Sequence, residues 1–149
     1  MTVASVTPGY SGTPLPQKLG LKDGQRVLFI SLPKELKDLR KSRNFIEIAE
    51  AGWETFTDGD PGYDVIHGFT ASRAVLEKSA KKLMKQIDRD GTIWISWPKK
   101  AARVPTTVTE DVLPSIFVPL GLVDVKVCAV DETWSALKFM FRKELRAGL

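Results

Sequence analysis

The chain has 149 residues, 43% of them hydrophobic, which is typical of one globular domain with its own core. A single cysteine and a single histidine exclude a disulfide scaffold and a closed structural zinc site, and no apolar run approaches the roughly 18 residues of a membrane helix. The formal net charge of +4 is mild, and basic residues are mixed with acidic ones, so the sequence indicates neither a nucleic-acid-binding face nor a membrane partner.

Prolines and glycines are frequent in residues 1–25, which predicts an irregular N-terminal arm packed on the rest of the chain. Residues 26–149 are expected to form a single domain. This domain begins with a buried strand at 26–31, because RVLFIS is a continuous apolar run with a glycine before it and a proline after it. A short charged helix at 34–42 and a weaker strand at 47–51 are predicted next.

The turn-forming sequence TDGDPGY leads into an apolar strand predicted at 63–69. The clearest helix spans 72–89, where aliphatic residues fall on one face and lysines fall elsewhere. We expect Gly91 to end this helix. The run GTIWISWP then predicts a strand at 91–97 that ends before a proline.

A third helix is predicted at 108–120. Thr107 and Glu110 have the spacing of a capping box at its start, and Pro114 is expected to kink it beyond the first turn. Gly121 suits the position just after the helix.

The last two strands are predicted at 123–130 and 135–143, with the turn DETW between them. So short a link cannot make a crossover, so these strands should pair antiparallel. The earlier strands alternate with helices, which indicates parallel pairing. The sequence therefore predicts an α/β fold, Rossmann-like and mostly parallel, with helices on both faces and a C-terminal antiparallel hairpin.

Charged residues follow the carboxyl ends of two of the predicted strands. Ligands of open parallel sheets bind beyond these ends. The strand at 91–97 is followed by Lys99 and Lys100, which could hold an anion. The strand that ends near residue 130 is followed by Asp131 and Glu132, and a right-handed crossover places both strand ends on one edge. We expect an ion pair between one of these lysines and one of these acids. The alternative is that the lysines are solvated and the acids belong to a turn.

Two further groups complete this predicted ligand-binding rim. Trp134 offers an apolar wall beside the charges, although it could simply close the core. The arm residues Tyr10, Ser11 and Thr13 lie on a segment long enough to reach over the edge.

Three blocks of the sequence, YSGTPLPQKLGLKDGQRVLFIS, ISWPKK and GLVDVKVCAVDETWSALKFMFRK, together resemble a bacterial family of small proteins of unknown function. Members of that family look like a shortened Rossmann-type methyltransferase domain. The resemblance runs from Tyr10 to Lys143 and is weakest at 33–62. It implies a methyltransferase-like fold and no established activity.

An S-adenosylmethionine or nucleotide site would need glycines after the first strand, so that the backbone can approach the ligand. Leu32 and Pro33 stand there instead and fill the space with side chains. Glu50 and Glu54 are only loose candidates for an acid that binds the ribose. The sequence therefore predicts weak or absent binding of S-adenosylmethionine, and no cofactor.

The first functional hypothesis is a non-catalytic binding or regulatory domain whose partner is an unidentified small molecule or protein. It has no predicted catalytic or metal-binding residue, because His67 and Cys128 lie inside apolar strands and are expected to be core residues. The alternatives are an S-adenosylmethionine-dependent methyltransferase with a divergent cofactor loop, and a weak nucleic-acid binder. The N-terminus lacks the regions of a signal peptide and one unpaired cysteine fits a reducing compartment, so a cytoplasmic location is expected.

Overall fold

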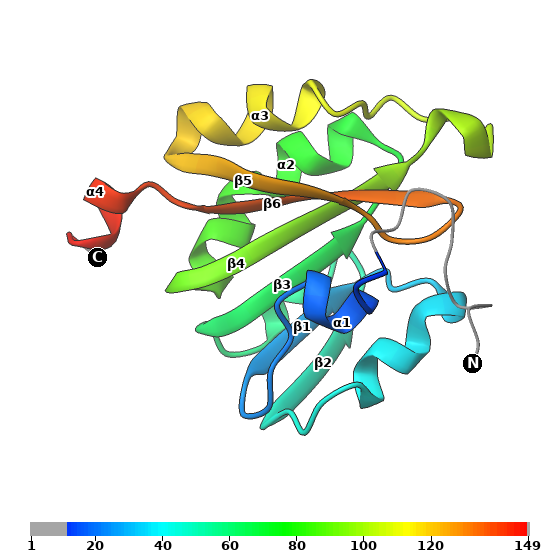
Figure 1. The fold of residues 1–149 in the computed structure, drawn as a ribbon. Helices are drawn as coiled ribbons and strands as arrows, with labels where there is room; N and C mark the ends of the chain where they lie inside the picture. The colour runs from blue at the N-terminus through cyan, green and yellow to red at the C-terminus, as the bar shows by residue number, and fades with distance from the viewer. Residues whose placement is uncertain (1–11, 149) are drawn as a thin grey trace.

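The computed structural model describes residues 12–148, which form a six-stranded sheet with the order β2-β1-β3-β4-β6-β5 (Figure 1). The strands are β1 (Arg26–Ile30), β2 (Glu47–Ala51), β3 (Tyr63–Phe69), β4 (Ile87–Pro98), β5 (Leu122–Ala129) and β6 (Trp134–Phe141). The first four strands are parallel, and β6 lies antiparallel between β4 and β5. The predicted class, a mostly parallel α/β sheet with a C-terminal antiparallel hairpin, is confirmed.

One face of the sheet is covered by α2 (Arg73–Gln86), α3 (Val112–Phe117) and the 3₁₀ helix η5 (Val118–Leu120), and is called here the helix face (Figure 1). Helix α2 starts where the Ser72 hydroxyl oxygen accepts a hydrogen bond from the Val75 N–H at 3.3 Å.

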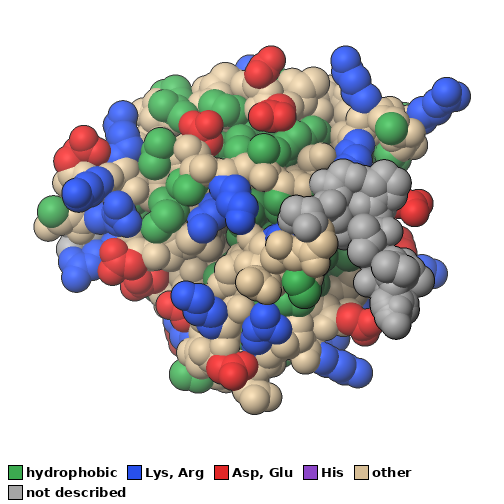
Figure 2. All heavy atoms as spheres, viewed as in Figure 1, with side chains coloured by type: hydrophobic (Ala, Val, Ile, Leu, Met, Phe, Trp, Pro, Cys, Tyr) green, Lys and Arg blue, Asp and Glu red, His purple; other side chains and the backbone are tan. Residues whose placement is uncertain are grey.

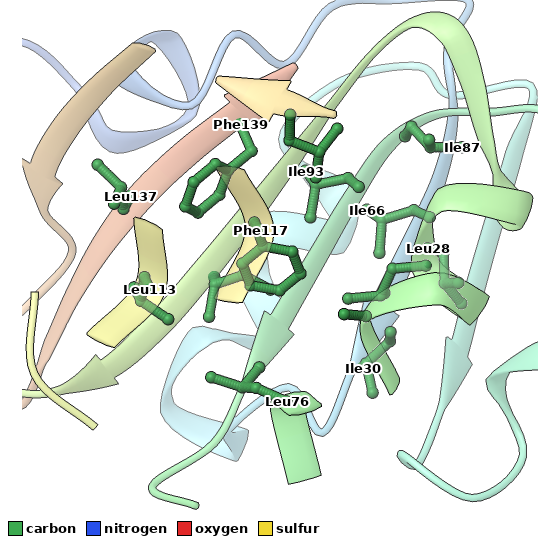
Figure 3. Close-up of a cluster of buried hydrophobic side chains, with 14 of the residues drawn as sticks. Leu28, Ile30, Ile66, Leu76, Ile87, Ile93, Leu113, Phe117, Leu137 and Phe139 are labelled. Carbon is green, nitrogen blue, oxygen red and sulfur yellow. The ribbon is translucent and has the colours of Figure 1, made fainter. Parts of the chain in front are cut away.

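The core on the helix face consists of aliphatic and aromatic side chains. Figure 3 shows Leu113 and Phe117 of α3 beside Leu137 and Phe139 of β6. The rings of Phe117 and Phe139 are 4.9 Å apart, within the range of a favourable aromatic pair. Periodic apolar residues on the helices and continuous apolar runs in the strands therefore meet in one cluster.

The opposite face, called here the arm face, is covered by α1 (Leu15–Lys18), by the 3₁₀ helix η2 (Lys34–Lys41) and by residues 130–134. Leu19 and Leu21 are buried there, and the Trp94 indole N–H donates to the Leu19 carbonyl oxygen at 3.0 Å. The division into an arm of residues 1–25 and a domain of residues 26–149 stays a prediction.

The helix predicted at 72–89 ends at Gln86, and residues 87–90 belong to β4. Ile87 pairs with Tyr63 at the start of β3. Gly91 is a strand residue rather than a helix stop, and an added Cβ there would lie 2.9 Å from the Asp64 carbonyl oxygen. Sheet pairing therefore overrides the helical pattern at this point.

The helix predicted at 108–120 begins only at Val112, so Thr107 and Glu110 form no capping box. The Thr107 hydroxyl oxygen instead accepts a hydrogen bond from the Arg73 N–H at 2.7 Å, at the start of α2. Pro114 falls in the first turn of α3, where a missing N–H costs nothing, so the sequence requires no kink. Gly121, with a φ of 116°, ends η5 as predicted.

The remaining helical elements are the single turns η3 (Phe56–Asp58), η4 (Lys100–Ala102) and α4 (Lys143–Arg146). Within residues 12–148, no helix combines the length and the apolar composition that crossing a membrane requires.

Candidate functional site

The sheet has a switch point between β1 and β3, because the chain places β2 on one side of β1 and β3 on the other. Open α/β sheets bind ligands beyond the carboxyl ends of the strands at such a point. The loops after β1, β2 and β3 are therefore the first candidates for ligand contact.

Ser31 makes the turn after β1 in the left-handed region, with a φ of 57°. Its N–H donates to the Ala51 carbonyl oxygen at 2.9 Å, which ties the turn to the end of β2. A residue other than glycine held in this region costs on the order of 1–2 kcal/mol, and such strain clusters at functional sites. Leu32 does not fill the switch point, because its side chain is buried in the arm-face core. A serine therefore adopts a backbone conformation that glycine adopts most readily, although it keeps a side chain that glycine lacks.

Glu50 lies near the carboxyl end of β2 and pairs with two cations of η2. Arg40 Nε is 3.0 Å from Glu50 Oε2, and Lys37 Nζ contacts Glu50 Oε1. These partly exposed pairs are worth about 0–1 kcal/mol each. A carboxylate has about four acceptor sites, so Glu50 can accept further hydrogen bonds. Glu54 forms no ion pair with any residue between 12 and 148.

Trp53 follows β2 and reaches across to the end of β3. Its indole N–H donates to the Phe69 carbonyl oxygen at 2.9 Å. Its ring lies on Gly68, where an added Cβ would be 2.5 Å from Trp53 Cη2, so only glycine permits this contact. The half-buried indole forms a wall beside the switch point. Sequence reasoning missed this pair, although a glycine inside an apolar strand is a signal of close approach.

The loops after β4 and β5 meet at the same edge of the sheet, as the handedness rule predicts. The Lys99 N–H donates to the Thr133 carbonyl oxygen at 2.8 Å. The expected ion pair is wrong: among residues 12–148, no salt bridge joins Lys99 or Lys100 to Asp131 or Glu132. Asp131 Oδ1 instead accepts from the N–H groups of Thr133 and of the next residue, at 2.8 and 2.7 Å. Asp131 is thus engaged by its own turn, which was the alternative interpretation.

Lys99 and Lys100 line a cavity of about 830 Å³. This volume suits a small-molecule site. The cavity also exposes hydroxyl and carboxylate groups from the sequence TTVTED, namely Thr106, Thr109, Glu110 and Asp111. Sequence reasoning used that run only as a helix start and therefore missed these groups.

Two other predicted rim residues, Trp134 and Thr13, do not line this cavity. Trp134 packs edge-on against Phe69, with ring centroids 5.3 Å apart. Thr13 lines a separate cavity of about 540 Å³. Tyr10 and Ser11 lie outside the described residues. Whether any of these residues binds a ligand stays a prediction.

His67 lies in the arm-face core, with Nε2 2.6 Å from the Ser96 hydroxyl oxygen and its ring stacked on Phe69 at 4.3 Å. Burial lowers the pKa of His67 to about 3. Cys128 is also buried, and burial raises the pKa of its thiol. Both are packed core residues, as expected. In the described part of the chain, no group of three His, Cys, Asp or Glu side chains is placed to hold a metal ion.

No family model matches the chain, and no curated protein matches it by sequence. Its fold is similar to that of solved methyltransferases. A SAM-dependent methyltransferase from Aquifex aeolicus gives a TM-score of 0.65 at 16% identity, over 84% of this chain and 86% of that one. A SAM-dependent methyltransferase from Thiobacillus denitrificans, solved with S-adenosyl-L-homocysteine, gives 0.60 at 13% identity, over 86% and 89%. At these identities the similarity shows the fold: the chain has a methyltransferase-like Rossmann fold.

Proposed function

We propose that the protein is an S-adenosylmethionine-dependent methyltransferase that holds its cofactor with a divergent loop after β1. The observation that most supports this is the left-handed Ser31 at the switch point of a methyltransferase-like sheet. The two neighbours described above are SAM-dependent methyltransferases, and one contains S-adenosyl-L-homocysteine. This combination favours the enzyme over the non-catalytic domain, because Leu32 is buried in the arm-face core rather than filling the loop, and the left-handed turn forms there without glycine.

The residues at the switch point fit such a cofactor. Glu50 would accept hydrogen bonds from the ribose hydroxyls, as acids after a strand do in related nucleotide sites. Trp53 offers an aromatic wall to the adenine base. When bound, S-adenosylmethionine supplies an electrophilic methyl group. The part of this chain is to orient that group and to keep water away from it.

Calorimetric titration of the full-length protein with S-adenosyl-L-homocysteine tests the proposal. We expect one site with a micromolar dissociation constant. Replacing Glu50 by Gln (Glu50→Gln) should weaken binding about tenfold, the effect of losing roughly one charge-assisted hydrogen bond. Glu54→Gln is the matched control, because Glu54 lies just after β2 and forms no ion pair with any residue between 12 and 148. Absence of heat and of any thermal shift with both S-adenosylmethionine and S-adenosyl-L-homocysteine would overturn the proposal.

The second candidate is the non-catalytic binding domain, and one observation favours it. Trp53 is hydrogen-bonded across the end of β3 while Glu50 is already held by two cations, so the switch point is partly closed. Trp53→Ala separates the two candidates. If the protein is a methyltransferase, this change weakens the binding of S-adenosyl-L-homocysteine. If the switch point is closed, the wild type does not bind S-adenosyl-L-homocysteine and the variant gains affinity for it.

A further inference from the structure

Lysine side chains converge on the arm face near the end of β5. Lys126 of β5 and Lys138 of β6 are direct partners in the antiparallel register. Like charges placed opposite each other on neighbouring strands destabilise a sheet, so an unrelieved pair calls for an explanation. Figure 2 shows Lys and Arg side chains interspersed with Asp and Glu side chains on this face, and neither Lys126 nor Lys138 forms a salt bridge with a residue between 12 and 148.

A cavity of about 540 Å³ opens beside these lysines, between the segment that contains α1 and the end of β5. Among residues 12–148, its lining contains two ammonium groups, several neutral hydrogen-bonding groups and the thiol of Cys128, but no carboxylate: Thr13, Gln17, Lys18, Lys126, Val127, Cys128, Ala129 and Ser135. Lys18 Nζ donates to the Ala129 carbonyl oxygen at 3.1 Å, which fixes this ammonium group at the cavity.

The charges of Lys18 and Lys126 both act on the thiol of Cys128 in the cavity wall. Burial raises the pKa of the Cys128 thiol, and both ammonium groups oppose that rise. The pKa of Lys138 is lowered first by burial and then by repulsion from Lys126 and Lys22. Among the lining residues between 12 and 148, the two ammonium groups are therefore present without an acidic side chain.

We propose that this cavity binds a small organic phosphate, with Lys18 and Lys126 holding the phosphate and the wall at Cys128, which faces the same side of β5 as Lys126, contacting the organic part. A phosphate monoester carries about −1.5 to −2 charges near neutral pH, which matches two ammonium groups better than a single carboxylate does. The cavity volume lies in the range of small-molecule sites and far exceeds a lone phosphate ion. The inference does not depend on methyl transfer, because the site lies on the arm face and needs no cofactor.

Phenyl phosphate is a suitable probe for titration of the full-length protein at constant ionic strength. We expect one-site binding, and at least about tenfold weaker binding in Lys126→Ala, since each lost charge-assisted hydrogen bond costs a factor of that order. Lys126→Arg should keep most of the affinity. Lys143→Ala, in the exposed α4, is the matched control for the loss of one positive charge. Inorganic phosphate should bind more weakly than phenyl phosphate, because it lacks the apolar part.

Cys128 is the only cysteine of the chain and lines the cavity, so it locates the bound probe. Only the unliganded protein should react with N-ethylmaleimide at Cys128. When phenyl phosphate occupies nine-tenths or more of the sites, the alkylation rate should therefore fall at least about fivefold. Lys126→Ala removes one of two opposed like charges and should stay folded, which its thermal unfolding will verify. Protection that is equal in wild type and Lys126→Ala, or that sodium chloride of the same ionic strength reproduces, would overturn the proposal.

Discussion

The two faces of the sheet are built in different ways. On the helix face, Leu76 and Leu83 of α2 and Phe117 of α3 are fully buried, and their packing follows helical periodicity. On the arm face, the covering chain is a single turn of helix, a 3₁₀ helix and loops. Its core contains polar groups paired at long range, such as the Trp94 indole with the Leu19 carbonyl and the His67 imidazole with the Ser96 hydroxyl. The helix face is held by side-chain packing, whereas the arm face also depends on specific hydrogen bonds.

This difference bears on how the cavity beside Lys18 and Lys126 is formed, although the helix face has a cavity too, of about 440 Å³, between α2 and α3. An irregular segment covers the sheet only where individual residues such as Leu19 and Leu21 are inserted. The cavity beside Lys18 and Lys126 lies at the margin of that cover.

The largest expected effect tests how far the arm face depends on its covering segment. Deleting residues 1–25 removes Leu19 and Leu21, which are buried, and takes away the acceptor of the Trp94 N–H. At about 2–5 kcal/mol for each buried leucine, the free energy of unfolding should fall by about 4–10 kcal/mol. Urea unfolding followed by tryptophan fluorescence measures this loss.

Deletion of residues 143–149 is the control for that experiment, because α4 is mostly exposed and should cost less than about 1 kcal/mol. If residues 26–149 alone unfold with nearly wild-type stability, the predicted arm is dispensable and the arm face is not built as described.

Phe117→Ala tests the helix face in the same way. Phe117 is completely buried and packs on Phe139, so its truncation should cost about 3–5 kcal/mol and leave the arm face intact. Urea unfolding measures the loss of stability. Near-ultraviolet circular dichroism shows whether the tryptophans keep their environments, since Trp97 packs in the helix-face cluster and Trp94 in the arm-face cluster. Val123→Ala, on an exposed part of β5, should change stability by less than about 0.5 kcal/mol. Equal effects of both changes would contradict the assignment of Phe117 to the core.

The same contrast decides what could be predicted from the sequence. The strands and α2 were predictable because continuous apolar runs and a 3.6-residue period arise from local burial. Residues 87–90 were misassigned because their pairing partner, Tyr63, lies far away in the sequence. The contact of Trp53 with Gly68 and the pairing of Trp94 with Leu19 likewise join distant segments.

For the candidate site, handedness correctly placed the loops after β4 and β5 on one edge. The charges there do not pair, because Asp131 bonds to the backbone of its own turn. Local hydrogen bonds of this kind compete with long-range ion pairs, and formal charge in the sequence does not reveal which prevails. The left-handed Ser31 could not be predicted either, since serine rarely adopts that conformation.

Acid sensitivity is the expected property of the arm face. The pKa of buried His67 is about 3, whereas an exposed histidine in the unfolded chain titrates near 6.5. Below pH 6.5 the unfolded chain therefore binds a proton that the folded chain refuses, and stability falls as the pH falls. From pH 7.5 to pH 4 this one group should remove about 3 kcal/mol.

Carboxylates add their own acid dependence, so the measurement is a difference between two proteins. Urea unfolding across this pH range should show a steeper loss in the wild type than in the double variant His67→Phe/Ser96→Ala, which removes both partners of the buried hydrogen bond. Parallel pH profiles of the two proteins would show that His67 is protonated equally in the folded and unfolded states.

The smallest expected effect concerns a buried polar atom without a hydrogen-bond partner at the end of α2. The Gln86 side chain is buried at the end of this helix, and its Oε1 finds no hydrogen-bond partner among the described residues. An unpaired buried acceptor costs about 1–3 kcal/mol, so Gln86→Met should raise stability by about 1 kcal/mol and the Tm by about 2–4 °C in a domain of this size. Gln86→Glu should do the opposite, because it places a charge in the same unpaired position. Differential scanning calorimetry measures the Tm of the three proteins. If the helix face is held by packing alone, the Tm is highest with Met at position 86, intermediate with Gln and lowest with Glu. A loss of stability in Gln86→Met would mean that the amide is hydrogen-bonded in solution, and that the helix face, like the arm face, depends on a specific polar contact.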